Sequence, residues 1–170
     1  MRLGILSDSH GRATMTARAV ALLEAHGAEL LIHLGDVETE AVIDELVGHP
    51  ARIVFGNCDY DIAALTRYAA HVGVTVDHPA GRLEADGRVI AFTHGHIRRI
   101  MDAALADGVD YLLHGHTHTA RDERAGRTRI INPGALFRAS RYTAAVLDVA
   151  ADRLSFIEVR QELPTGRPDA

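Results

Sequence analysis

Seven side chains that can bind a metal ion stand in five short polar clusters of this 170-residue sequence. They are Asp8, His10, Asp36, Asn57, His94, His116 and His118. The set offers carboxylate, carboxamide and imidazole donors and no thiolate. Because imidazole favours the later transition metals, these donors suit Mn²⁺, Fe²⁺, Ni²⁺, Co²⁺ or Zn²⁺ better than Ca²⁺ or Mg²⁺. We expect divalent transition-metal ions here, with Mn²⁺ as the first candidate.

The spacing of these donors predicts two ions rather than one. Two of the clusters hold their donors two residues apart, and in an extended chain such side chains point to the same side. Seven donors are too many for one structural ion. They suit two ions bridged by a carboxylate, each with an open position for water or substrate. Spacing alone does not decide between His94 and His96 as the ligand of the fourth cluster.

The charge of such a centre indicates an anionic substrate. Two divalent ions bring four positive charges, of which Asp8, Asp36 and a bridging hydroxide neutralise three. The remaining positive charge matches a phosphodiester, whose hydrolysis needs an in-line nucleophile and a stabilised leaving oxygen. A two-metal centre supplies both. The residues therefore predict metal-dependent phosphoester hydrolysis.

Each cluster directly follows a short apolar run that predicts a β-strand. These runs cover residues 2–6, 30–34, 52–55, 88–92 and 110–113. Helical patterns alternate with them, at residues 14–25, 39–47, 61–70 and 97–106. Strands that alternate with helices imply right-handed crossovers and a parallel central sheet. Because the carboxyl ends of parallel strands frame one crevice, we expect the five clusters to lie side by side.

A further strand and three hairpins complete the expected elements. The strand covers residues 72–76, and the hairpins join 82–84 to 88–92, 119–124 to 127–131, and 142–148 to 154–160. The first hairpin turns at Asp86-Gly87, a typical hairpin dipeptide. We expect residues 1–160 to form one domain and residues 161–170 to be a flexible tail.

The composition excludes several function classes. All 18 basic residues are Arg, so the chain has neither a Schiff-base lysine nor a Walker-type phosphate lysine. With a net charge of -5 it lacks the basic stripe of a nucleic-acid binder, and we expect no stable nucleic-acid partner. One cysteine and no apolar run of about 18 to 20 residues predict a cytoplasmic protein without a membrane partner. Composition leaves a homo-oligomer open.

The order of the clusters resembles the calcineurin-like metallophosphoesterase superfamily, and within it the small bacterial and archaeal phosphodiesterase branch. The segments that carry the resemblance are Asp8-x-His10, Gly35-Asp36, Gly56-Asn57-Cys58-Asp59, Thr93-His94-Gly95-His96, Gly115-His116-Thr117-His118 and Asn132-Pro133-Gly134-Ala135. The resemblance implies a four-layer αββα sandwich with mixed sheets and a dinuclear metal site at the carboxyl ends of the strands.

The resemblance also implies a division of the ligands between two ions. One ion is expected on Asp8, His10, Asp36 and His118, and the other on Asp36, Asn57, His94 and His116. Asp36 is then the bridge. The resemblance selects His94 over His96 as a ligand and leaves His96 to touch the ligands or a phosphate oxygen.

The chain departs from many members of the superfamily at Cys58, where those proteins carry a histidine near the leaving group. Without that histidine, the chain lacks a general acid that could protonate the leaving group. This favours substrates with easily expelled leaving groups. We take His96, Asp59 and Cys58 as candidate catalytic residues: His96 on a phosphate oxygen, Asp59 steadying a ligand, and Cys58 either facing the substrate or inert. Arg98 and Arg99 either reach the phosphate or lie on a solvated helix face.

The remaining histidines have structural interpretations. His33 lies inside an apolar run, which favours a hydrogen-bonded core position. His114 either orients the neighbouring ligands or ends a strand. The others are expected at the surface, and they are His26, His49, His71 and His78.

The function predicted from the sequence is hydrolysis of a small phosphodiester by in-line attack of a metal-bridging hydroxide. Two alternatives use the same fold: a phosphomonoesterase that acts on a nucleotide or sugar phosphate, and a scaffold without activity, as in the retromer subunit that resembles this family. A metallo-β-lactamase type of hydrolase is excluded, because Ala120 and Arg121 stand where that fold needs an aspartate and a histidine.

Overall fold

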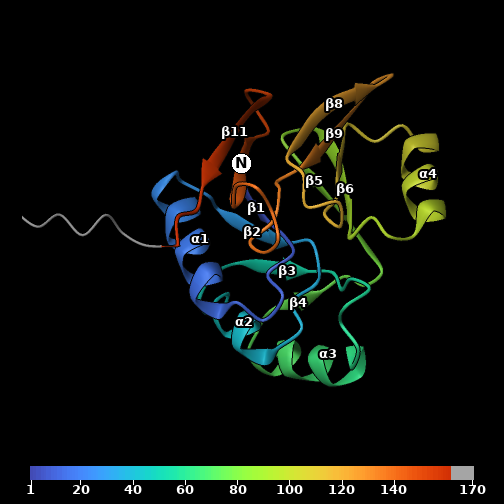
Figure 1. Cartoon of the computed structure of the whole chain (residues 1–170). Coiled ribbons are helices and arrows are strands. Elements are labelled where there is room, and N and C mark those ends of the chain that lie inside the picture. The colour runs from blue at the N-terminus through green and yellow to red at the C-terminus, as the bar shows by residue number, and fades with distance from the viewer. Residues whose placement is uncertain (162–170) are drawn as a thin grey trace, which may run out of the picture.

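The computed structural model describes residues 1–161, and two mixed β-sheets form its centre (Figure 1). The six-stranded sheet has the order β11-β10-β1-β2-β3-β4. Its strands are β11 (Arg153–Glu158), β10 (Thr143–Asp148), β1 (Arg2–Leu6), β2 (Leu30–His33), β3 (Ala51–Ile53) and β4 (Thr75–Val76). The strands from β1 to β4 pair in parallel, whereas β10 pairs antiparallel to both of its neighbours.

The five-stranded sheet has the order β5-β6-β7-β9-β8, and its central strands β6, β7 and β9 are parallel. Its strands are β5 (Ala80–Ala85), β6 (Arg88–Thr93), β7 (Tyr111–Leu113), β9 (Thr128–Asn132) and β8 (Arg121–Ala125). The edge strands β5 and β8 are antiparallel to their neighbours, and they form hairpins with β6 and β9 respectively.

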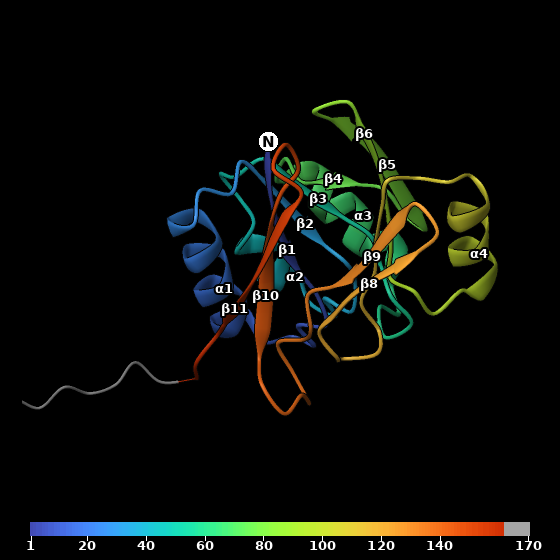
Figure 2. The ribbon, with the colours of Figure 1, turned by 90° about the horizontal axis from the view of Figure 1, so that it is seen from above.

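Helices cover the outer faces, so the four-layer αββα prediction is confirmed (Figure 2). The six-stranded sheet carries α1 (Ala13–Ala25), α2 (Glu40–Asp44) and α3 (Ile62–His71), and α4 (Arg98–Ala106) lies by β6 and β7. The start of α3 is fixed by Asp61, whose side chain accepts a hydrogen bond from the N–H of Ala64.

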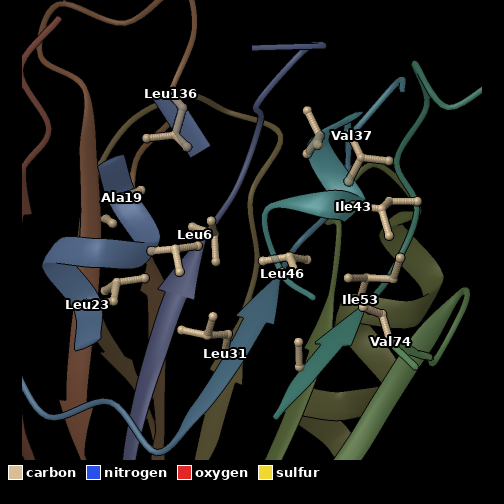
Figure 3. Close-up of a cluster of buried hydrophobic side chains, with 14 of the residues drawn as sticks. Leu6, Ala19, Leu23, Leu31, Val37, Ile43, Leu46, Ile53, Val74 and Leu136 are labelled. Atoms are coloured by element: carbon tan, nitrogen blue, oxygen red, sulfur yellow. The ribbon is translucent and has the colours of Figure 1, made fainter. Parts of the chain in front are cut away.

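Two apolar clusters hold these layers together. One lies between the sheets and takes Leu3 and Ile5 from β1 and Phe92 from β6. The other lies between the six-stranded sheet and its helices (Figure 3), and it includes Leu6 and Leu23. The alternation of side chains along β1 sends successive residues to opposite faces, which is why one strand serves both clusters.

The structure corrects three details of the sequence prediction. The strands belong to two sheets rather than to one parallel sheet, because the antiparallel hairpin β5–β6 starts a second sheet. The predicted strand 72–76 shrinks to β4, since residues 72–74 close α3 with backbone hydrogen bonds to Tyr68 and Ala69. The predicted helix 39–47 keeps only the residues of α2, and turns follow it.

Of the predicted tail 161–170, all but Gln161 lies outside the described residues, and the domain boundary at residue 160 stays a prediction. Within residues 1–161, no helix combines the length and the apolar character that crossing a membrane requires.

Candidate metal centre

The five polar clusters meet where strands of both sheets end. Asp8 follows β1, Asp36 follows β2 and Asn57 follows β3, all in the six-stranded sheet. His94 follows β6, and the 116–118 segment follows β7, both in the facing sheet. The prediction that the clusters lie together is confirmed, although the site lies between two sheets and not along the rim of one.

Four of the predicted ligands form one compact group. The donor atoms of Asp8, His10, Asp36 and His118 all lie within 4.8 Å of one another. Nε2 of His118 is 3.2 Å from Oδ1 of Asp8, and Nε2 of His10 is 3.5 Å from Oδ2 of Asp36. Two carboxylates and two imidazoles that converge in this way fit one divalent transition-metal ion.

The other predicted ligands gather on the opposite side of Asp36. Nε2 of His94 lies 3.4 Å from Oδ2 of Asp36 and 3.2 Å from Oδ1 of Asn57. The rings of His94 and His116 are 5.2 Å apart, centroid to centroid. The same oxygen of Asp36 thus lies close to a nitrogen of His10 and to a nitrogen of His94, a position that suits a bridging ligand.

The polar atoms of this site fit cations. Within the described residues, Oδ1 of Asp8 is buried and makes no hydrogen bond of regular geometry, although Nε2 of His118 lies 3.2 Å away. A buried carboxylate oxygen of this kind is costly unless a cation balances its charge. Burial by itself would raise the pKa of Asp36, but His94 and the N–H of Cys58 outweigh it and lower that pKa well below its usual range. The Asp36 carboxylate is therefore ionised.

Two hydrogen bonds fix which imidazole nitrogen faces the centre. Nδ1 of His94 donates to the carbonyl of Leu34 at 2.7 Å, which leaves Nε2 for a metal ion. Nδ1 of His10 lies 2.7 Å from Oε1 of Glu38 and leaves its Nε2 for the centre in the same way. Partners of this kind orient metal-binding histidines in many sites. Glu38 was missed in the sequence, although a carboxylate two residues after Asp36 was a usable signal.

Backbone strain is concentrated at this site. In the described part of the chain, nine residues other than glycine have a positive φ, and two of them, Asp86 and Asp152, lie in hairpin turns. The other seven surround the centre, and they are Asp8, His10, Asp36, Glu38, His116, His118 and Arg138. Left-handed conformations of such residues cost free energy and persist where surrounding structure imposes them, often at functional sites.

Two glycines allow the loops to approach the ligands. A Cβ added to Gly56 would collide with the carboxylate of Asp36, and one added to Gly115 would collide with Ser7 and press on Asp8. Neither glycine has a positive φ. Close approach, rather than a left-handed backbone conformation, explains glycine at these two positions.

The carboxylate of Asp59 fastens the loops that carry the ligands. It is buried and accepts hydrogen bonds from the backbone N–H groups of Asp36, Glu38 and Gly56, at 2.7 to 2.9 Å. Burial raises the pKa of Asp59, and these hydrogen bonds oppose the rise. Its contacts are those of a positioning residue, and the prediction that it steadies a ligand stays a prediction.

The neighbouring Cys58 contacts the centre through its backbone. Its N–H donates to Oδ1 of Asp36 at 2.9 Å, and its Sγ lies 3.4 Å from Nδ2 of Asn57. Burial, followed by the charge of Asp36, raises the pKa of the Cys58 thiol to about 11. The thiol is therefore protonated at neutral pH.

His96 lies beside the second group of ligands. Its ring is 5.3 Å from that of His94 and 6.2 Å from that of His116. Its Nδ1 is buried and has no hydrogen-bond partner among the described residues. Desolvation, and then the charge of His94, lower the pKa of His96. A neutral imidazole with a free nitrogen therefore borders the centre.

The remaining predictions for histidine and arginine have mixed outcomes. His33 is a buried core histidine as predicted, 2.7 Å from Oγ of Ser9. His49 and His78 were wrongly expected at the surface, since both are half-buried. Nδ1 of His49 lies 2.7 Å from Oε1 of Glu24, and the ring of His78 is 5.7 Å from that of Phe55. Arg98 is 89% exposed and pairs with Asp102, which favours a solvated helix face.

The comparisons with known proteins agree with this geometry. Residues 1–152 match the family model described as the calcineurin-like phosphoesterase superfamily domain. The chain belongs to the calcineurin-like phosphoesterase superfamily. Within the superfamily it is 28% identical over 138 residues to phosphodiesterase MJ0936 of Methanocaldococcus jannaschii, which spans 79% of this chain and 83% of the relative. It is also 28% identical over 151 residues to phosphodiesterase YfcE of Escherichia coli, covering 80% of this chain and 79% of YfcE.

A solved structure supports the same membership. The structure described as that of a novel archaeal phosphodiesterase superposes with a TM-score of 0.84 at 25% identity, over 93% of this chain and 99% of that one. The calcineurin-like phosphoesterase fold thus covers nearly the whole chain. Membership of the superfamily implies divalent metal ions, in keeping with the donor groups around Asp36.

Proposed function

We propose that this protein is a metal-dependent phosphodiesterase that hydrolyses a small phosphodiester with two divalent transition-metal ions, Mn²⁺ first among them. The observation that carries the proposal is the position of Asp36 between two groups of donors. Its Oδ2 lies 3.5 Å from Nε2 of His10 and 3.4 Å from Nε2 of His94. The relatives MJ0936 and YfcE, both named phosphodiesterases, support the same class of reaction.

Each ion is bound by one of the two groups of donors around Asp36. The first ion takes Asp8, His10, Asp36 and His118, and the second takes Asp36, Asn57, His94 and His116. When bound, such ions lower the pKa of water and neutralise the charge that develops around phosphorus. The chain's own part is to fix the donors: Glu38 orients His10, and Asp59 holds the loops of Asp36 and Gly56.

Two further side chains act on the substrate in this proposal. His96 donates a hydrogen bond to a phosphate oxygen, because its half-buried ring borders the second group of donors, 5.3 Å from the ring of His94. Cys58 stands where many members of the superfamily have a histidine, and a thiol is a weaker proton donor than an imidazolium ion. Substrates with good leaving groups should therefore be hydrolysed fastest.

The test is hydrolysis of bis(p-nitrophenyl) phosphate by metal-stripped protein that is resupplied with Mn²⁺, Ni²⁺, Co²⁺, Zn²⁺ or Mg²⁺ in turn. We expect no activity without metal, the highest activity with a transition metal, and about two ions per chain by elemental analysis. Asp36→Asn should lose both ions and the activity. Asp102→Asn removes an exposed carboxylate of α4 and serves as the matched control.

Other outcomes decide between the alternatives. Faster hydrolysis of p-nitrophenyl phosphate than of the diester would make the protein a phosphomonoesterase. Two bound ions without hydrolysis of either ester would favour a non-catalytic scaffold. Full activity of Asp36→Asn would contradict the assignment of the bridging ligand.

A further inference from the structure

The aromatic ring of Phe137 lies beside the proposed ligand His10, and two arginines lie over that ring. The ring of Phe137 is 5.2 Å from that of His10, centroid to centroid. The guanidinium groups of Arg12 and Arg138 lie 5.2 and 5.0 Å from the Phe137 centroid. Arg12 also lies 5.7 Å from the ring of Tyr142. Contacts with aromatic rings hold the planar guanidinium groups in place at the border of the metal centre.

These two arginines differ from most others in the described chain because neither is paired with a carboxylate. Eleven described arginines have a carboxylate oxygen within 4.0 Å, and Arg12 and Arg138 are not among them. A guanidinium group that lies on an aromatic ring without an acidic partner keeps its N–H donors for an anion from solution. Phosphate oxygens match that donor geometry.

The backbone of Arg138 is strained, with φ at 46°. It is one of the seven positive-φ residues around the centre, and the other six are proposed metal ligands or Glu38, which contacts one. Strain of this kind persists where the surrounding structure imposes it, and ligand clamps are among the places where it clusters. Arg138 directly follows Phe137 in the chain, and its guanidinium group lies over that ring.

Arg12 also lines a hollow of about 530 Å³ at the first turn of α1. Among the residues that the structure describes, the hollow is lined by residues 11–15, Arg18 and Gln161, and none of these carries a carboxylate. The first turn of α1 contains no acidic residue either. A hollow of this size can receive a small-molecule group, and its charges favour an anion.

We propose that Arg12 and Arg138 form a second anion subsite, so that the preferred substrate is a phosphodiester that carries a further phosphate group on one of its alcohols. The proposal rests on the phosphodiesterase function proposed above. The scissile phosphate belongs at the metal centre, and the second phosphate binds one aromatic ring away from His10. A nucleotide ester with phosphates on two hydroxyls of one sugar has this chemistry.

The kinetic test compares two esters that differ only in the second phosphate. They are the p-nitrophenyl ester of thymidine 5′-phosphate and the same ester with an additional 3′-phosphate. We expect the wild-type protein to favour the 3′-phosphorylated ester by about 10-fold or more in kcat/KM, chiefly through KM, as hydrogen bonds to a charged group allow. Arg12→Ala and Arg138→Ala should each bring this ratio close to one.

The matched control is Arg67→Ala, which removes an exposed arginine of α3 for which the described structure contains no ion pair. Its ratio should equal that of the wild-type protein. A wild-type ratio near one, or a ratio unchanged in both Arg12→Ala and Arg138→Ala, would overturn the subsite while leaving the phosphodiesterase proposal intact. Absence of hydrolysis of every diester would overturn the phosphodiesterase proposal instead.

A binding measurement makes the subsite testable without turnover. Titration calorimetry compares thymidine 3′,5′-bisphosphate with thymidine 5′-monophosphate on the metal-loaded protein. We expect the bisphosphate to bind about 10-fold more tightly or better, and the double variant of Arg12→Ala and Arg138→Ala to lose that difference. Equal affinities for the two nucleotides in the wild-type protein would contradict the subsite, and circular dichroism verifies that the double variant is folded.

Discussion

Outer carboxylates organise the metal centre at the scale of single residues. Glu38 holds Nδ1 of His10, and Asp59 holds the backbone of Asp36, Glu38 and Gly56. These groups fix rotamers and loop conformations that would otherwise cost free energy when a metal ion binds. We therefore expect metal affinity to depend on residues that do not bind the metal.

Glu38→Gln tests this dependence. Loss of the carboxylate removes the charge-assisted hydrogen bond to His10, so we expect the affinity for the ion at His10 to fall by about 10- to 100-fold. Calorimetric titration of metal-free protein with Mn²⁺ measures the change. Glu40→Gln removes an exposed charge two residues further along and should bind as the wild type does. Unchanged Mn²⁺ affinity in Glu38→Gln would show that His10 is oriented without Glu38.

Gly56→Ala tests the close approach of the third cluster to Asp36. The added Cβ would collide with the Asp36 carboxylate, so we expect a loss of about 1–3 kcal/mol in the free energy of unfolding and weakened binding of both ions. Gly126→Ala is the control, because the space around its Cβ is open and only its φ of 60° is strained. It should lose stability and still bind both ions, as urea unfolding and metal titration would measure.

The identity of the donors could be predicted from the sequence, but their partners could not. Residue type and spacing were enough to find six of the seven candidate ligands and to narrow the seventh to His94 or His96. The choice between His94 and His96 came from a family resemblance, whereas the structure gives a local reason, the hydrogen bond from His94 to the carbonyl of Leu34. A main-chain contact across 60 residues leaves no signal in residue types.

At the scale of the elements, strand ends were predictable and sheet membership was not. An apolar run indicates a buried strand, but it does not say which of two sheets the strand joins. The antiparallel hairpin of β5 and β6 begins the second sheet. The strand order within that sheet depends on long-range pairing, such as that of β7 with β9. The four-layer arrangement was predicted through the resemblance and not from the hydrophobic pattern.

The helices differ in how firmly they are packed. In α1, residues such as Met15, Ala19 and Leu23 are buried, whereas α4 has no buried residue. Burial of apolar side chains provides most of the stability of a helix in a protein. We therefore expect the amides of α4 to exchange hydrogen faster than those of α1, measured by mass spectrometry. Equal protection would mean that contacts of half-buried residues suffice for α4.

At the scale of the whole molecule, Asp152 links the two sheets. It lies in the turn between β10 and β11, and its carboxylate accepts hydrogen bonds from Tyr111 on β7 at 2.8 Å and Arg129 on β9 at 2.6 Å. Arg124 on β8 adds a third contact at 2.6 Å. One turn of the six-stranded sheet is thereby tied to three strands of the other.

This link predicts a pH dependence of stability. Burial would raise the pKa of Asp152, but Tyr111 and Arg129 outweigh it and lower the pKa. The stabilisation is therefore complete above the unfolded-state pKa of about 3.9 and is lost as the pH falls through the lower folded-state pKa. Asp152→Asn should reduce the free energy of unfolding at pH 7 by about 1 kcal/mol, since the carboxylate is 37% exposed.

The measurement is urea unfolding at pH 7 and at pH values below 4. The difference between Asp152→Asn and the wild type should shrink as the pH falls. Asp102→Asn, which alters an exposed pair within α4, should leave the pH profile unchanged. A difference that stays constant down to pH 2 would mean that Asp152 acts through packing rather than through its charge.

The position of β10 has a consequence for synthesis of the chain on the ribosome. All seven proposed ligands precede residue 119, but β1, which leads to Asp8, pairs on one side with β10 at residues 143–148. A nascent chain that ends between these points carries every donor and still leaves β1 with an open edge, which is prone to wrong pairing. Metal ions that bind during translation would thus meet an unfinished sheet. We therefore expect the metal site to be completed only when β10 and β11 have emerged and β10 has paired with β1.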